Sequence, residues 1–184
     1  ITTRRIAATA ELGALSARVQ AVLAAGEPLS ISYEIAHAPA GLTAAQEGMT
    51  ERLELWYNEM FKEGRARDIA RATTGVGPHL DDLVLTTCGM NLRSYGSQGQ
   101  QRTGALALKL AELFYLRDRV GEAPILLLDD VMSELDADRR RALLSFIRSE
   151  QIQTFITATD AAYFPEERMG TYRYVEAGKI REGK

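Results

Sequence analysis

The sequence predicts an α/β fold: a lobe with a parallel sheet covered by helices, joined to a mostly helical segment. In the second half of the chain, strand and helix patterns alternate, which is typical of a parallel sheet. The branched apolar residues 125–128 have the composition of a parallel strand buried on both faces. Two glycines and a proline within 73–81 interrupt the periodic patterns. We therefore predict a helical arm segment over 1–73, with one strand near 29–35, and an α/β lobe over 74–184.

The arm segment contains two predicted helices, one on each side of its strand. Apolar side chains recur at helical spacing in residues 1–25, and Gly26 followed by Pro28 marks the end of that helix. A second helix is predicted from near residue 43 to about Ala72. Its apolar face is formed by Met49, Leu53, Trp56, Met60 and Phe61.

The elements of the lobe are predicted from apolar runs separated by turn residues. They are strands at 83–87, near 90–93, at 125–128 and at 153–157, helices at 100–119 and 137–149, and a closing hairpin that turns at Ala177-Gly178. The strand–helix–strand order is the basis for the predicted parallel sheet.

The composition is that of a soluble globular protein, with 46% apolar and 26% charged residues. No run of consecutive apolar residues approaches the roughly 20 that a membrane span requires, so we expect no membrane association. The formal net charge of −3 argues against a polybasic nucleic-acid binder. Two arginine clusters, within 65–71 and 139–141, are interpreted as solvated helix faces, with a local basic patch as the alternative.

Two further features concern the setting of the chain. Cys88 is the only cysteine of the sequence, which excludes an internal disulfide and favours a reducing, cytoplasmic location. The sequence begins Ile-Thr-Thr-Arg-Arg, without an initiating Met and without a signal-peptide pattern. We therefore expect it to be a fragment of a longer polypeptide.

An acidic pair, Asp129 and Asp130, follows the strand at 125–128. In open α/β sheets, ligands bind at the carboxyl ends of the strands. One carboxylate there can hold Mg²⁺, directly or through water, and a second can position or deprotonate an attacking water. The alternatives are an acidic strand end that caps the next helix, and a phospho-acceptor pair like that of receiver domains.

A second polar group, Ser97 to Gln101, stands directly before a long predicted helix. A hydroxyl and free backbone N–H groups at a helix N-terminus form an anion site. Gly99 would allow a phosphate to approach the backbone closely. A plain helix cap is the alternative interpretation.

The order of these motifs resembles that of ABC-type ATPases. In that resemblance, 97–101 corresponds to the signature motif, 125–130 to the Walker B strand, and Ser133-Glu134-Leu135-Asp136 to the D-loop. The expected fold is accordingly an ABC-type P-loop ATPase lobe with an α-helical arm segment.

Within that superfamily the sequence most resembles the RecF family of DNA-repair ATPases. The resemblance is carried by Gly77-Pro78-His79-Leu80-Asp81-Asp82, by 97–103, and by 124–136. It is strong over residues 70–160 and extends to the flanks only in layout.

The resemblance implies ATP and Mg²⁺ as cofactors, with Asp129 holding Mg²⁺ through water and Asp130 acting as the catalytic base. The residues implied to contact the γ-phosphate of ATP held by the other subunit are Ser97, Gln98, Gly99, Gln100 and Gln101. Ser133 and Asp136 are implied as D-loop residues, and Thr159 as a sensor of the γ-phosphate.

One position departs from the pattern of the RecF family, and two others, of which Asp130 agrees with RecF-like proteins, depart from the pattern of most ABC-type enzymes. Leu80 replaces an Arg in the Gly-Pro-His segment, and residue chemistry there explains His79 as well by a structural role as by a functional one. Asp130 stands where most ABC-type enzymes have Glu, and its shorter side chain predicts slow hydrolysis. Thr159 stands where a switch His is common, and a hydroxyl can donate to a phosphate but cannot carry a positive charge.

The sequence contains no Gly-x-x-x-x-Gly-Lys-Ser/Thr phosphate loop. Without that loop the β- and γ-phosphates lack their main holder, so we expect this chain alone to be inactive. For the complete protein, the resemblance implies an ATP-dependent homodimer with two composite sites. It also implies binding to single-strand gaps and junctions in DNA, and recombinase loading with RecO and RecR as partners. The alternatives are an SMC-type or transporter ATPase head, and a non-catalytic module whose signature helix is only a dimerisation surface.

Overall fold

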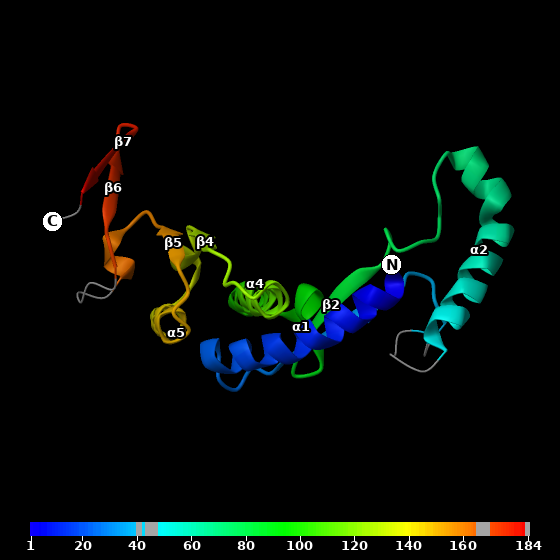
Figure 1. Cartoon of the computed structure of the whole chain (residues 1–184), viewed down its shortest axis with the longest axis horizontal. Helices are drawn as coiled ribbons and strands as arrows, with labels where there is room; N and C mark the ends of the chain where they lie inside the picture. Colours follow the sequence, from blue (N-terminus) through cyan, green and yellow to red (C-terminus); the bar gives the residue numbers. More distant parts are fainter. Residues whose placement is uncertain (40–41, 43–47, 165–169, 183–184) are drawn as a thin grey trace.

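The structure, a computed structural model, describes residues 1–39, 42, 48–164 and 170–182. Its helices are α1 (Thr2–Leu23), α2 (Met49–Arg71), α3 (Leu92–Tyr95), α4 (Gln98–Val120) and α5 (Ala137–Ser149), with 3-10 turns η1 (Val131–Glu134) and η2 (Ala161–Tyr163). Its strands are β1 (Leu29–Glu34), β2 (Asp82–Thr87), β3 (Met90–Asn91), β4 (Leu126–Asp129), β5 (Thr154–Thr157), β6 (Arg173–Glu176) and β7 (Lys179–Glu182). The arrangement is elongated, with α2 at one end, the β6–β7 hairpin at the other, and α1 and α4 crossing between them (Figure 1).

Helix α1 is central to the packing of the molecule, because it contacts both α4 and β1. Val19 and Leu23 lie in one core with Leu110 of α4, whose side chain is completely buried. Burying a leucine of this kind stabilises the fold by roughly 1.5–3 kcal/mol. By length and mean hydropathy (1.2), α1 is the one helix in the described part of the chain that could cross a membrane. Its packing on α4 and β1 is that of a core helix.

The first sheet is antiparallel, in the order β1-β2-β3. Leu29 pairs with Thr87 and Glu34 with Asp82, so β1 and β2 are matched over their whole length. The strand predicted at 83–87 therefore does not belong to a parallel sheet. β1 occupies one edge of β2, and β3 occupies the other, because Cys88 and Gly89, with positive φ angles of 48° and 76°, form a two-residue turn between β2 and β3. Such a turn can join only antiparallel neighbours.

Two boundaries near this sheet differ from those predicted. β3 ends at Asn91, because the Asn91 side chain accepts a hydrogen bond from the Ser94 backbone N–H (3.2 Å) and caps α3. The strand predicted to reach residue 93 is thus wrong beyond residue 91. The pairing of β1 with β2 also joins the two domains predicted on either side of 73/74. That division of the chain stays a prediction.

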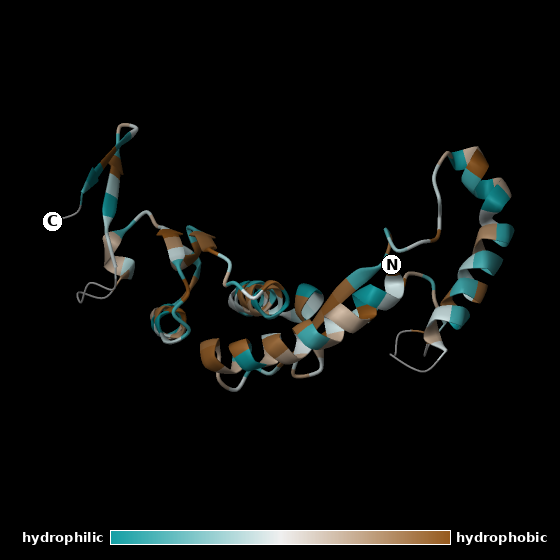
Figure 2. Cartoon of the chain, in the orientation of Figure 1, coloured by the Kyte–Doolittle hydropathy of each residue, from teal (hydrophilic) through white to brown (hydrophobic). Residues whose placement is uncertain are grey.

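The second sheet consists of the parallel strands β4 and β5, with Leu126 opposite Thr154 and Asp129 opposite Thr157. Leu126 and Leu128 point into the core with residues of α4 and α5. Leu127 is 70% exposed and Phe155 is 57% exposed on the other face. Figure 2 shows hydrophobic residues along both strands. The prediction of a strand buried on both faces is wrong, because the described residues supply a helical layer on one face only.

A smaller core lies between the start of α1, the end of β1 and the start of α2. It contains Ile6, Tyr33, Ile35, Leu42, Met49 and Leu53. The predicted start of α2 near residue 43 lies outside the described residues, and the described helix begins at Met49. Of its predicted apolar face, Met49 and Leu53 are buried, whereas Phe61 is 42% exposed. Helix α2 therefore packs through its first turns and projects beyond them (Figure 1).

The closing hairpin is present as predicted, with β6 paired antiparallel to β7 from Arg173–Glu182 to Glu176–Lys179. Ala177 and Gly178 have φ angles of 48° and 74°, the conformation of a tight hairpin turn. The helices predicted at 100–119 and 137–149 are also confirmed, as α4 and α5.

Candidate functional site

The acidic pair lies at the carboxyl end of β4, where β5 ends beside it. The Thr157 hydroxyl donates a hydrogen bond to Asp129 Oδ1. The Asp130 backbone N–H donates to Thr157 Oγ1 (3.0 Å) and to the Thr157 carbonyl oxygen (3.2 Å). One threonine therefore orients the Asp129 carboxylate and holds the backbone of Asp130. No sequence motif marks Thr157, although its place at the end of the next parallel strand is a signal for this position.

Asp130 has a left-handed backbone, with φ 51°. Aspartate tolerates this conformation better than most residues, and such sparsely populated backbones cluster at functional sites. Its carbonyl oxygen accepts hydrogen bonds from the Ser133 hydroxyl (2.8 Å) and the Ser133 N–H (3.3 Å). The turn directs the chain out of the sheet and into η1, so the two aspartates are exposed at the sheet edge. The hydrogen bonds from Ser133 stabilise this turn.

The second predicted D-loop residue, Asp136, is the N-cap of α5. Its Oδ1 accepts a hydrogen bond from the Arg139 backbone N–H (2.9 Å). That hydrogen bond, and the nearby Arg139 charge, hold the pKa of the Asp136 carboxyl below its ordinary value. Asp136 thus has a structural role in addition to any role toward a ligand.

The predicted signature segment forms a capping box at the start of α4. Ser97 Oγ accepts from the Gln100 N–H (3.2 Å), and Gln100 Oε1 accepts from the Ser97 N–H (3.0 Å). The Gln101 amide donates to the Gly96 carbonyl oxygen (3.0 Å). Ser97 and Gln98 are exposed, and Gly99 is half-buried. The cap interpretation is correct as far as it goes, and a capped, exposed helix N-terminus also remains suited to an anion.

Two arginines form ion pairs with residues of the D-loop. Arg102 forms an ion pair with Glu134 (3.5 Å), with both side chains almost half exposed. Arg139 pairs with Glu27 (2.8 Å) and Asp136 (3.6 Å), and its side chain is only 18% exposed. The interpretation of 139–141 as a solvated face is therefore wrong for Arg139. Arg139 precedes the buried Leu143 by one helical turn, and that spacing was the signal for an inward position.

The Gly77–Asp82 segment, which residue chemistry left without an account, is a clamp between β2 and β1. Asp81 accepts hydrogen bonds from the Tyr33 hydroxyl (2.6 Å) and the Ala36 N–H (3.0 Å). Arg5 donates to the Pro78 carbonyl oxygen and to the Tyr33 hydroxyl. Burial and the bond to Asp81 raise the pKa of Tyr33 to about 12.

The side chains of His79 and Leu80 lie at the surface of this clamp. His79 is exposed and its Nε2 lies 3.2 Å from the Thr74 carbonyl oxygen. Leu80 is 43% exposed. His79 therefore contacts its own loop. Leu80, which replaces the Arg of the family pattern, lies on the surface.

Thr159 lies two residues beyond the end of β5 and is exposed. Its neighbour Asp160 caps η2 by accepting from the Ala162 N–H (2.8 Å). Its role as a sensor stays a prediction.

Among the residues of β4, only Asp129 has a side chain that could hold Mg²⁺. Within the described ranges, no group of three or more His, Cys, Asp or Glu side chains gathers as a metal site. Mg²⁺ characteristically takes one or two carboxylates and completes its shell with water and phosphate oxygens. An exposed carboxylate at a sheet edge, oriented by Thr157, fits that requirement.

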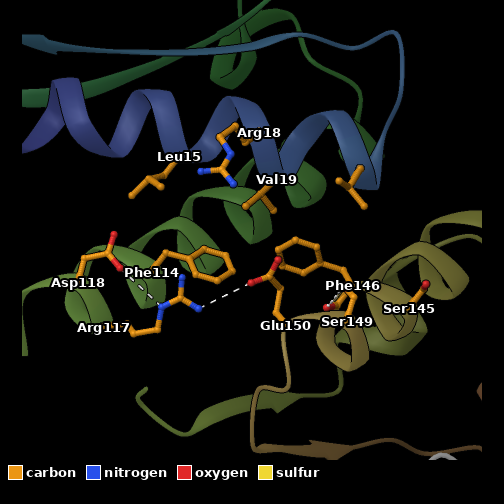
Figure 3. A pocket seen from close by; sticks show the side chains of 11 residues that line it. Leu15, Arg18, Val19, Phe114, Arg117, Asp118, Ser145, Phe146, Ser149 and Glu150 are labelled. Carbon is orange, nitrogen blue, oxygen red and sulfur yellow. Dashed lines mark hydrogen bonds and ion pairs between the residues drawn. The ribbon is translucent and has the colours of Figure 1, made fainter. Parts of the chain in front are cut away.

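A cavity of about 300 Å³ lies elsewhere, between α1, α4 and α5 (Figure 3). Arg117 enters it, pairs with Glu150 (3.7 Å) and stacks over the Phe114 ring (4.7 Å). Phe146 meets Phe114 edge to face. Neither the aspartate pair nor the signature segment lines this cavity.

Comparison with known proteins gives close relatives. The chain is 43% identical over 182 residues to the DNA replication and repair protein RecF of Chloroflexus aurantiacus, covering 97% of this chain and 45% of the relative. It is 53% identical over 127 residues to the RecF of Heliobacterium modesticaldum, covering 67% of this chain and 34% of the relative. This chain is RecF-like. It spans less than half the length of these curated relatives, and no family model matches it.

Solved structures of RecF have the same fold. One, of the recombination mediator protein RecF in the RecFOR pathway in the form named RecF-ATPrS, matches with a TM-score of 0.72 and 31% identity, over 98% of this chain and 46% of that chain. The form named RecF-ATP matches with a TM-score of 0.72 and 32% identity, over 95% of this chain and 44% of that chain. The prediction of an ABC-type ATPase lobe corresponding to the C-terminal part of RecF is confirmed.

A more distant likeness concerns the fold alone. A structure from work on ATP-driven dimerization and DNA-stimulated activation of SMC ATPases matches with a TM-score of 0.56 at 12% identity, over 100% of this chain and 90% of that chain. RecF-like and SMC-like heads thus share one architecture, and the RecF-like assignment rests on the higher sequence identity.

Proposed function

We propose that this chain is the signature and Walker B part of a RecF-like ATPase that acts in DNA repair. The observation that carries the proposal is the Asp129–Asp130 pair at the end of β4, contacted by Thr157 and followed by a D-loop whose Glu134 pairs with Arg102 of the signature helix α4. The identity to RecF proteins supports it. The arrangement offers two exposed groups: an acidic edge for a metal and water, and a capped helix N-terminus for a phosphate.

The acidic edge serves the nucleotide of its own subunit. Asp129 holds Mg²⁺ through water, and the ion supplies neutralisation of phosphate charge when bound. Asp130 positions the attacking water and accepts a proton from it. Because Asp is shorter than Glu, the water lies farther from the carboxylate than in most ABC-type enzymes, and hydrolysis is slow.

The signature segment serves the nucleotide of the partner subunit. The N–H groups at the start of α4, with the hydroxyl of Ser97 and the amides of Gln98, Gln100 and Gln101, face its γ-phosphate. Gly99 permits the close approach. Ser133 and Asp136 lie at the same interface, and Thr159 senses the γ-phosphate of its own subunit. ATP thereby stabilises a homodimer, and hydrolysis releases it.

The proposed setting is the cytoplasm, on DNA with single-strand gaps, where the dimer promotes recombinase loading with RecO and RecR. The RecF structures that resemble this chain are described as those of a mediator protein in the RecFOR pathway. These partners are proposals for the complete polypeptide, since the chain spans less than half of its relatives.

The chain alone is proposed to be inactive, because its sequence carries no Gly-x-x-x-x-Gly-Lys-Ser/Thr loop. Appreciable Mg²⁺-dependent phosphate release by the 184 residues would contradict this. Recovery of binding to a fluorescent ATP analogue, on addition of the remaining part of a RecF polypeptide, is the expected result.

The trans role is tested with Ser97→Arg in the complete protein. The long cationic side chain obstructs the signature surface and breaks the capping box. ATP-dependent dimerisation, followed by light scattering, should be lost, whereas ATP binding by the monomer should be unchanged. Ser94→Arg is the matched control, because Ser94 is an exposed serine of the neighbouring helix α3. Unchanged dimerisation of Ser97→Arg would exclude the trans role and favour a head that works without this segment.

A further inference from the structure

Arg139 contacts three segments that are far apart in the sequence. Its Nη2 donates to Glu27 Oε1 (2.8 Å) in the turn between α1 and β1. Its Nε lies 3.6 Å from Asp136 Oδ2 in the D-loop. Its Nη1 lies against Gly99, where a methyl group on the glycine would be only 2.9 Å away. One guanidinium thus fills the space between the D-loop, the signature segment and the first turn of the chain.

Of these contacts, the ion pair with Glu27 is the sheltered one, whereas the Asp136 side chain is 59% exposed. The side chains of Arg139 and Glu27 are 18% and 28% exposed. An ion pair sheltered from water is screened far less than one at the surface, and its geometry is fixed by the planar guanidinium. The guanidinium fits against Gly99 because glycine has no side chain. The packing of Arg139 is therefore a second reason, besides the approach of a phosphate, for a glycine at this position.

We propose that Arg139 is a positioning residue that locks the signature segment to the D-loop, so that both meet the nucleotide of the partner subunit as one rigid surface. This inference rests on the proposed trans role of the two segments. Arg139 acts through Gly99 and Asp136, by fixing the distance between the start of α4 and the start of α5. The Glu27 carboxylate anchors the guanidinium from the opposite side.

A second arginine at the same junction supplies a matched control. Arg102 pairs with Glu134 across the same two segments, at 3.5 Å, but the two side chains are 45% and 46% exposed. Exposed ion pairs contribute little, because solvent screens them and both side chains lose freedom. Arg102→Lys and Arg139→Lys therefore make the same chemical change in a weak and in a sheltered contact. Lysine keeps the positive charge but cannot contact Glu27 and Gly99 at once.

The clamp itself is tested by amide hydrogen exchange of the complete protein without nucleotide. Arg139→Lys should accelerate exchange at the hydrogen-bonded amides of 100–104 and 139–143 by roughly tenfold, because the two segments open independently. Arg102→Lys should leave those rates unchanged. Glu27→Gln, which keeps Arg139 and weakens its anchor, should give a smaller acceleration at the same amides. Equal rates in wild type and Arg139→Lys would overturn the inference.

The consequence for the dimer is measured separately. Arg139→Lys should weaken ATP-dependent dimerisation roughly tenfold, with monomer affinity for a fluorescent ATP analogue unchanged. A general folding defect would lower both, and that outcome would also overturn the inference. If the wild-type complete protein does not dimerise with ATP, the proposed function fails, while the exchange experiment still decides whether Arg139 joins the two segments.

Discussion

At the scale of single residues, the sequence predicts the acidic pair but not the residue that orients it. Asp129 and Asp130 are recognisable because a local pattern, an apolar strand followed by two aspartates, places them at a sheet edge. Thr157 contacts both of them from a strand that lies 27 and 28 residues later in the chain. No local pattern reports such a contact, because it depends on which strands pair. The inward position of Arg139 can be inferred from its spacing to Leu143, but its partners Glu27 and Gly99 cannot, since tertiary packing brings them to it.

Tyr33 illustrates a residue whose chemistry is set entirely by distant neighbours, and it supports a prediction on pH. Its pKa is raised from 10.0 to about 12, first by burial and then by the hydrogen bond to Asp81. The folded state therefore holds the phenol proton more tightly than the unfolded state. The stabilisation from this shift is fully present below about pH 10 and is lost as the pH rises toward about 12.

We expect Tyr33→Phe to lower the free energy of unfolding by about 1 kcal/mol below pH 10, because Asp81 loses a hydrogen-bond donor. The difference between wild type and variant should shrink between pH 10 and 12, in urea-unfolding measurements across that range. Tyr174→Phe is the control, because Tyr174 is 51% exposed and should change nothing. A difference that stays constant over the range would contradict the raised pKa.

At the scale of elements, the sequence predicts the helix ends, the closing hairpin and the parallel pairing of β4 with β5, but not the partner of β2. The starts of α4 and α5 depend on residues within one turn, Ser97 with Gln100 and Asp136 with Arg139. Such capping interactions can be read from the sequence. The antiparallel pairing of β1 with β2 joins residues about fifty positions apart, with α2 between the two strands, so no local pattern reports its direction.

The cap of α5 gives a prediction at this scale. Asp136→Ala should lower the free energy of unfolding by about 1 kcal/mol, because the Arg139 N–H loses its acceptor. Asp136→Asn should retain most of that stability, since asparagine is an equally good N-cap. Urea unfolding of both variants makes the comparison. A loss of equal size in the two would show that charge, rather than the cap hydrogen bond, is the stabilising interaction.

At the scale of the whole molecule, the described chain covers its small parallel sheet on one side only. Leu126 and Leu128 are buried under α4 and α5, whereas Ile125, Leu127 and Phe155 are 54%, 70% and 57% exposed. The sequence predicted burial on both faces because a run of branched apolar residues is typical of a strand between two layers. That pattern indicates that both faces of such a strand are covered where it is stable, but it does not indicate which residues cover them. A contiguous apolar surface of this kind is typical of a contact region.

This uncovered face predicts how the 184-residue chain behaves in solution. We expect self-association at micromolar concentration, strengthened by sulfate, because association removes the apolar face from water. Leu127→Glu should reduce it, since a charge on the face opposes burial. Val120→Glu is the matched control: Val120 is also 70% exposed, but it stands at the end of α4 and outside the two strands. Sedimentation velocity of the three proteins makes the test. If Val120→Glu disperses the chain as well as Leu127→Glu does, added charge rather than the face of β4 and β5 controls association, and the argument from the uncovered sheet fails.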